Sequence, residues 1–343
     1  MPTSKIYYMD AIEGLRRLAD ESVDTCITSP PYFNLRDYGC AGQIGLERTP
    51  EEYIDKLVAI FREVRRVLKA DGTLWVNIAD SYAGSGKGAA QYPNNAKKYK
   101  QGTNKGMLGC SCTIKRTIEG IKPKDLIGIP WMLAFALRAD GWYLRQDIIW
   151  HKPNPMPESV KDRCTKSHEY IFLFSKSKKY YFDSEAIAEP CVGYDKTAPR
   201  GSKGCFTPNS GRRKGNNKSF RGGGAYTKGQ TFNNSATVQR ETHGNAPNEK
   251  GTRNRRSVWV VATKGYKQAH FATFPNKLVE PCVLAGSRNG GTVLDPFCGT
   301  GTTLMVAQKN GRHSIGIEIN QAYREFIRDR LGPEADITEH FIT

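Results

Sequence analysis

The stretch Thr292-Val-Leu-Asp-Pro-Phe-Cys-Gly-Thr-Gly-Thr-Thr303 decides the fold of this chain. It starts as a short β-branched strand, places the carboxylate of Asp295 at the strand end, and passes through two glycines into a helical pattern. Glycines allow the backbone to approach a ligand closely. A second strand leads to Glu318, about 20 residues after the turn, where an acid can bind the hydroxyls of a ribose. The pattern predicts a nucleotide-binding turn.

Two other interpretations of this turn are weaker. A phosphate-binding loop carries a lysine followed by serine or threonine directly after the glycines, and no lysine stands there. A glycine turn can also do no more than close a helix against a sheet, but the spaced acid Glu318 favours a nucleotide site. The turn therefore favours a nucleoside with an uncharged tail.

Short β-branched runs alternate with helical patterns along most of the chain. This alternation predicts an α/β fold in which helices cover a mainly parallel sheet. Strands are expected at 23–28, 73–78, 143–150, 170–174, 292–294 and 314–317. Helices are expected at 50–69, at 124–139 with an interruption near Pro130, and at 302–309.

The net charge of +17, from 51 Lys and Arg against 34 Asp and Glu, is concentrated in two segments. Residues 83–118 hold 7 basic and no acidic residues, and residues 191–256 hold 14 basic and 3 acidic residues. Both are poor in apolar residues, so we interpret them as surface insertions. Solvated loops are the plain alternative, but the one-sided charge suits a polyphosphate backbone and predicts nucleic-acid binding. The expected DNA contacts are Arg212, Arg213, Lys214, Lys218 and Arg221.

Composition argues against several classes of protein. No run of 18 apolar residues predicts a membrane span, and the first ten residues do not have the pattern of a secretory signal. The nine cysteines include no Cys-x-x-Cys pair, so we expect reduced thiols and no metal site. A cytoplasmic enzyme is the expectation.

The tetrapeptide Ser29-Pro-Pro-Tyr32 follows the predicted strand 23–28. Its two prolines, Pro30 and Pro31, hold the turn in a rigid, extended shape. An ordinary strand-ending turn is the alternative for this motif alone. Acceptors on Ser29 and on the Pro30 carbonyl can hold the two N–H groups of a nucleobase amine and direct its lone pair, while Tyr32 stacks on the base.

Together the two motifs resemble those of amino-directed DNA methyltransferases, and their order is similar to the β arrangement of that family. The resemblance implies a Rossmann-like fold with helices on both faces and circularly permuted motif order. It implies S-adenosylmethionine as cofactor and double-stranded DNA with a flipped-out target base as substrate. It also implies a catalytic motif of Ser29, Pro30, Pro31 and Tyr32. The cofactor-binding residues it implies are Asp10, Asp295, Pro296, Phe297, Gly299, Gly301, Thr302, Glu318 and Lys277.

On this basis the chain divides into a catalytic half at 1–190, which includes the insertion 83–118, a target-recognition region at 191–256, and a cofactor-binding half at 257–343. Within the last part, residues 270–281 resemble the helix-starting motif that closes over the methionine end of the cofactor. A prokaryotic or phage-encoded enzyme of a restriction-modification system is expected. A cognate restriction endonuclease and a homodimeric state are left open as further partners.

The methylated base is predicted as cytosine at N4, because serine at the first position of the tetrapeptide resembles the cytosine-N4 enzymes. Adenine-N6 stays the alternative, since a neutral hydroxyl suits either amino group. Cytosine-C5 chemistry would need a cysteine nucleophile. Cys191 begins the second basic segment and Cys282 lies in an apolar helical pattern, so neither is assigned that role. A non-catalytic DNA-binding scaffold, and methylation of RNA, protein or a metabolite, are the rivals from other classes.

Three further polar residues have open roles. Asp80, which follows the predicted strand 73–78, is divided between a cofactor contact and a helix cap. His151 and His168 are assigned to structure or to the DNA-facing surface rather than to catalysis.

Overall fold

The computed structural model describes residues 2–35, 39–84, 118, 120–190, 251–263 and 275–341. Contacts between residues divide the chain into two units, one of Met1–Ile187 with Arg256–Thr343 and one of Ala188–Arg255.

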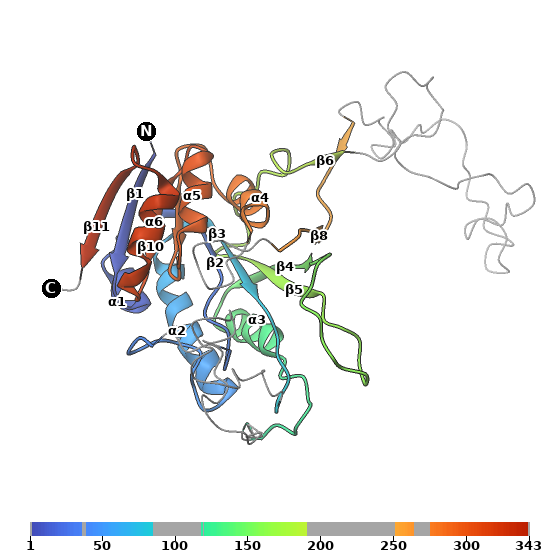
Figure 1. The fold of residues 1–343 in the computed structure, drawn as a ribbon. Helices are drawn as coiled ribbons and strands as arrows, with labels where there is room; N and C mark the ends of the chain where they lie inside the picture. The colour runs from blue at the N-terminus through green and yellow to red at the C-terminus, as the bar shows by residue number, and fades with distance from the viewer. Residues whose placement is uncertain are drawn as a thin grey trace, which may run out of the picture. The chain divides into compact units, whose positions relative to one another are not determined.

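The larger unit is built on one nine-stranded sheet (Figure 1). The strand order is β11-β1-β10-β9-β2-β3-β5-β4-β8. All neighbours pair in parallel except β5, which is antiparallel to both β3 and β4, so the predicted mainly parallel sheet is confirmed. The strands are β1 Thr3–Tyr8, β2 Val23–Thr28, β3 Leu68–Ile78, β4 Tyr143–His151, β5 His168–Ser175, β8 Val258–Val260, β9 Thr292–Asp295, β10 His313–Ile317 and β11 Asp336–Phe341.

Helices cover both faces of this sheet, as the Rossmann-like fold requires. Their buried side chains separate into two clusters, one on each side of the strands. The first cluster takes in α1 Ala11–Arg16, α2 Pro50–Val67 and α3 Ile129–Ala139, and the second takes in α4 Asn276–Gly286, α5 Thr302–Lys309 and α6 Arg324–Leu331.

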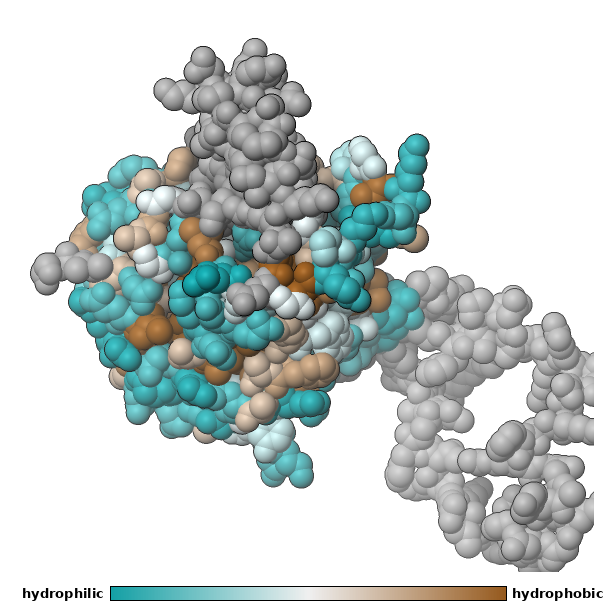
Figure 2. Space-filling view, turned by 90° about the horizontal axis from the view of Figure 1, so that it is seen from below, coloured by the Kyte–Doolittle hydropathy of each residue, from teal (hydrophilic) through white to brown (hydrophobic). Residues whose placement is uncertain are grey.

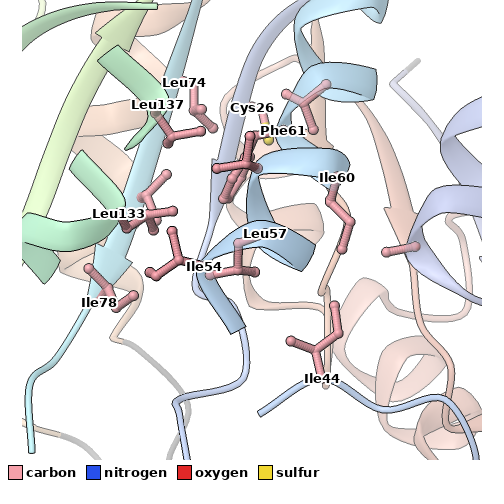
Figure 3. Close-up of a cluster of buried hydrophobic side chains, with 14 of the residues drawn as sticks. Cys26, Ile44, Ile54, Leu57, Ile60, Phe61, Leu74, Ile78, Leu133 and Leu137 are labelled. Atoms are coloured by element: carbon pink, nitrogen blue, oxygen red, sulfur yellow. The ribbon is translucent and has the colours of Figure 1, made fainter. Parts of the chain in front are cut away.

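Helix α2 shows how the sequence determines where a helix begins, what it packs against and where it ends. Thr49 caps its start by accepting a hydrogen bond from the backbone of Glu52, and Pro50 occupies the first turn. Its apolar stripe, which includes Leu57 and Phe61, is buried against β2, β3 and α3 (Figure 3). Burial of each such side chain contributes about 1.5–3 kcal/mol to the stability of the fold. The helix ends at Val67 rather than at residue 69, because β3 begins at once.

The prediction of a helix at 124–139 is wrong for residues 124–128. The helix begins at Ile129, and Pro130 lies in its first turn rather than interrupting it. Proline is tolerated there because the first N–H groups of a helix have no intrahelical partner. Upstream, Lys124 (φ 76°) and Gly128 (φ 86°) adopt left-handed backbone conformations that no helix continues through.

The smaller unit is described only at its two ends. There β6 Glu189–Pro190 pairs with β7 Thr252–Arg253, and Arg253 Nε donates to Glu189 Oε1 at 2.8 Å. The five basic residues expected on DNA, from Arg212 to Arg221, lie outside the described residues. So does the insertion 83–118, apart from residues 83, 84 and 118.

No helix among the described residues is long and apolar enough to cross a membrane. Over the described part of the chain, no three His, Cys, Asp or Glu side chains gather as metal ligands would. In Figure 2, hydrophilic residues occupy much of the coloured surface, with hydrophobic ones interspersed.

One carboxylate secures the edge strand β11. Glu339 accepts hydrogen bonds from Arg324, at 2.7 Å for the nearer pair, from Arg328, also at 2.7 Å, and from the Tyr8 hydroxyl at 3.2 Å. These arginines lower the pKa of Glu339 to about 2, the hydrogen bond from Arg324 being the largest cause. Because the folded pKa is depressed, the stabilisation is complete above the ordinary pKa of about 4.5 and is lost as the pH falls toward 2.

We expect Glu339→Gln to lower the free energy of unfolding by about 2 kcal/mol at pH 7. This value is smaller than the full pKa shift would give, because solvent screens the charges of the half-exposed arginines. The difference from the unsubstituted chain should shrink between pH 5 and pH 3. Urea unfolding at both pH values measures it. An equal difference at the two pH values would contradict this assignment.

Candidate functional site

The two sequence motifs lie side by side at one edge of the sheet. Strand β2 pairs in parallel with β9, with Cys26 opposite Leu294, so their carboxyl ends are neighbours. The tetrapeptide at 29–32 continues from β2 and the glycine turn continues from β9. In open α/β sheets, ligands bind outside the carboxyl ends of the strands.

A buried hydrogen bond joins the two strand ends directly. Thr28 Oγ1 donates to Asp295 Oδ1 at 2.7 Å. Asp295 also accepts from the Phe297 N–H at 3.1 Å and from Thr303 Oγ1 at 2.6 Å, and its side chain is fully buried. Burial raises the pKa of Asp295 to about 6, although the hydrogen bonds from Thr303 and Thr28 oppose the rise. Asp295 therefore holds the end of β2, the glycine turn and α5 together, while its contact with a cofactor stays a prediction.

The two glycines of the turn serve different purposes. Both have positive φ, +52° at Gly299 and +77° at Gly301, which favours glycine. A Cβ on Gly299 would have no neighbour within 4 Å, so the space above it is open for a ligand. A Cβ on Gly301 would lie 3.3 Å from Ile327 Cγ2, so this glycine permits α6 to pack closely. Thr302 then starts α5 and is buried.

Glu318 lies directly beside this turn, at the end of β10. Its Oε2 accepts from the Gly299 N–H and its Oε1 from the Asn320 N–H, both at 2.8 Å. Burial raises the pKa of Glu318 to about 7, against the effect of those two backbone hydrogen bonds. A buried carboxylate this close to ionisation equilibrium at neutral pH is typical of a functional site.

Thr300 is a turn residue that the sequence reasoning did not single out. Its hydroxyl is buried without a hydrogen-bond partner among the described residues. Buried polar atoms are seldom left unsatisfied, so an orphaned hydroxyl marks where a ligand can bind. Together with the open space at Gly299 and the carboxylate of Glu318, it fits the polar groups of a nucleoside. The signal was present in the motif itself, between the two glycines.

The other expected cofactor residues differ in their surroundings. Asp10 follows β1 and caps α1, accepting from the Ile12 N–H at 2.9 Å. Lys277 is exposed in the first turn of α4. Pro296 is buried, and Phe297 packs partly buried against the first core cluster. Cofactor contacts of these four residues stay predictions.

The tetrapeptide is held rigidly from two sides. Tyr53 of α2 donates its hydroxyl hydrogen to the Pro31 carbonyl at 2.8 Å. Gly45, with φ +99°, lies so close that a Cβ there would be 2.9 Å from the Tyr32 carbonyl oxygen. Pro30 is buried, whereas Ser29, Pro31 and Tyr32 are half-buried. The turn thus presents partly accessible side chains on a fixed backbone.

The phenol of Tyr32 belongs to a buried polar network. Its hydroxyl donates to Glu169 Oε2 at 2.7 Å and is hydrogen-bonded to the Ser29 hydroxyl. Burial, reinforced by the charge of Glu169, raises the pKa of Tyr32 well above its ordinary value. Tyr32 therefore stays protonated at neutral pH.

Sequence reasoning missed the carboxylate in this network. Glu169 lies near the start of β5, and because β5 runs antiparallel, its first residues reach the same edge of the sheet as the ends of β2 and β3. Glu169 also accepts from Asn77 Nδ2 at 3.1 Å and from Lys152 Nζ. A lone glutamate directly before the predicted strand 170–174 carries no local signal of such a position.

The structure shows the contacts of the three polar residues to which the sequence assigns no single role. Asp80 caps α3 by accepting a hydrogen bond from the Gly128 N–H at 3.0 Å. Of its two expected roles, helix cap and cofactor contact, the structure shows the helix cap. His168 stands edge-on to Tyr170, with ring centroids 5.4 Å apart, and pairs with His151 across β4 and β5. Burial, followed by the charge of Lys166, lowers the pKa of His168.

Comparison with known proteins identifies the family of this chain. The DNA methylase family of N6 and N4 methyltransferases matches residues 23–329. The chain is 44% identical to the type II methyltransferase M.SmaI of Serratia marcescens over 95% of its own length and 90% of that protein. It is 43% identical to M.Cfr9I of Citrobacter freundii, over 95% and 86% of the two chains. Among solved structures, the cytosine-N4-specific PvuII DNA methyltransferase superposes with a TM-score of 0.59 at 17% identity, covering 97% of this chain and 87% of that one.

The chain therefore belongs to the N6/N4 family of DNA methyltransferases. Members of this family use S-adenosylmethionine as methyl donor. The resemblance drawn from the two motifs is confirmed at this level.

The role of the hydrogen bond between Thr28 and Asp295 can be tested by substituting two threonines of β2 in the same way. Thr28→Val removes a donor to buried Asp295, and Thr25→Val removes a hydrogen bond to Thr73 Oγ1, 2.9 Å long, from the interior of the same strand. Each should cost about 1–3 kcal/mol of stability. Only Thr28→Val should weaken S-adenosylmethionine binding, by about tenfold, because only Thr28 orients the turn. Calorimetric titration measures it, and equal affinities in the two variants would refute the assignment.

Proposed function

We propose that this protein is a site-specific DNA methyltransferase that transfers the methyl group of S-adenosylmethionine to the exocyclic N4 of a cytosine flipped out of duplex DNA. The observation that carries the proposal is the buried Thr28–Asp295 bond, because it joins the tetrapeptide and the glycine turn into one site. The open space above Gly299, with Glu318 beside it, gives the nucleoside of the cofactor a place to bind.

Bound S-adenosylmethionine supplies an electrophilic methyl group on a sulfonium. The lone pair of the cytosine amine is delocalised into the ring, so the site must relocalise it. The Ser29 hydroxyl oxygen and the Pro30 carbonyl accept the two amine hydrogens and direct the lone pair toward the methyl carbon. Tyr32 stacks on the flipped base. Methyl transfer to the nitrogen would leave the donor as a neutral thioether, and the Ser29 hydroxyl would relay the extra proton on the nitrogen to water.

Serine at position 29 supports cytosine over adenine as the methylated base, because a serine at the start of the tetrapeptide resembles the motif of the cytosine-N4 enzymes. The structural neighbour that is described as cytosine-N4-specific agrees with this choice. Adenine-N6 remains the second candidate, since the matched family includes both activities and a neutral hydroxyl suits either amine. The type II relatives support a role in a restriction-modification system, with a cognate endonuclease that cuts the same site.

The base can be identified directly. Plasmid DNA incubated with the protein and labelled S-adenosylmethionine should yield labelled N4-methylcytosine after digestion to nucleosides and mass spectrometry. Ser29→Ala should lower the methylation rate by about 10²–10³-fold, because one acceptor for the amine is lost, with little change in DNA affinity. Labelled N6-methyladenine would establish the second candidate instead. DNA binding without any methylation by the unsubstituted protein would favour the non-catalytic scaffold.

Cofactor affinity should depend on pH through Glu318. If its carboxylate accepts the ribose hydroxyls, the deprotonated form is needed, so affinity should fall as the pH drops below about 7. Glu318→Gln should bind more weakly and lack this dependence. The amino group of the ligand titrates in both proteins, so the difference between their calorimetric profiles between pH 6 and pH 8 isolates Glu318. Parallel profiles would rule out the ribose contact.

A further inference from the structure

We propose that Glu169 is a positioning residue that fixes the phenol ring of Tyr32 at the angle on which the flipped base stacks. The inference rests on the proposed function, because it concerns how the same site receives its base. It assigns a role to a carboxylate that neither sequence motif contains.

The geometry of Glu169 is that of a fixed anchor. Its side chain is 11% exposed and accepts hydrogen bonds from three groups on three segments of the chain. These are Tyr32 of the tetrapeptide at 2.7 Å, Asn77 of β3 at 3.1 Å, and Lys152, directly after β4. Asn77 is held in turn, since its Nδ2 also donates to the Tyr170 carbonyl at 3.1 Å.

The charge of Glu169 has a partner of its own. Lys152 forms an ion pair with it, and the same ammonium group lies 4.3 Å from the centroid of the Trp150 ring. A buried carboxylate is costly unless it is paired and hydrogen-bonded, and this one is both. A paired carboxylate of this kind accepts a strong hydrogen bond from a phenol.

Anchoring matters because the ring of Tyr32 is held at its hydroxyl, where Ser29 and Asn77 Oδ1, 3.3 Å away, share the hydrogen bonding with Glu169. The hydrogen bond at Pro31 and the close approach of Gly45 fix the main chain of the turn, but they do not set the rotation of the ring about its side-chain bonds. Hydrogen bonds at the far end of the ring remove that freedom, and the one to Glu169, at 2.7 Å, is shorter than the one to Asn77. A stacking platform in a fixed orientation positions the amine relative to the methyl group, and small misplacements of reacting groups slow a reaction strongly.

A double-mutant cycle with Glu169→Gln and Tyr32→Phe tests the proposal on the full-length protein. Both changes keep the size of the side chain. Each alone should lower the single-turnover rate of DNA methylation about 10- to 100-fold, with KM for DNA changed less than twofold. In the Tyr32→Phe background, Glu169→Gln should lower the rate by less than about twofold more, because the hydrogen bond through which it acts is already gone.

Glu339→Gln is the matched control, since it removes another carboxylate that binds basic side chains but lies at the edge strand β11. It should lower the thermal midpoint and leave the methylation rate unchanged. The proposal is overturned if Tyr32→Phe methylates at the wild-type rate, a result that does not depend on how well Glu169→Gln folds. It is also overturned if Glu169→Gln slows both backgrounds by the same factor. Failure of the unsubstituted protein to methylate any DNA would instead refute the proposed function.

Discussion

The hydrogen bond from Thr28 to Asp295 is the interaction on which the rest of the site depends. Residues 267 positions apart in the chain are brought together there, at the carboxyl ends of two neighbouring parallel strands. The carboxylate has no access to water, so its three hydrogen bonds must compensate for the loss of solvation. A displaced partner would leave a buried charge unsatisfied. The strand ends are therefore held in one relative position, which a reaction between two bound molecules requires.

Two acids at this edge are kept in environments that disfavour their charged forms. The pKa of Asp295 is about 6 and that of Glu318 about 7, and in both cases burial is the largest cause. Glu339, by contrast, stabilises the fold because its pKa is lowered. The glycine turn is thus a place where stability is reduced for the sake of preformed polar groups, as is common at functional sites.

The motif-bearing parts of this structure could be predicted from sequence, because short, rigid turns state their geometry locally. The strand, turn and helix around Asp295 needed only the glycines and the flanking β-branched residues, and the helix 302–309 was predicted with correct bounds. Strand β1 and its neighbour β11 at the edge of the sheet were not predicted, since short strands with mixed polarity resemble loops. Glu169 could not be predicted as part of the site, because its position depends on the antiparallel direction of β5, which no local pattern encodes.

The structure of a complex with S-adenosylhomocysteine tests the central claim most directly. The account predicts the adenosine over Gly299, with its ribose on Glu318, and the sulfur turned toward the tetrapeptide at 29–32. Both turns would then line a single pocket around one ligand. A ligand bound elsewhere on the chain, or one that touches the glycine turn while its sulfur faces away from Ser29 and Tyr32, would contradict the account.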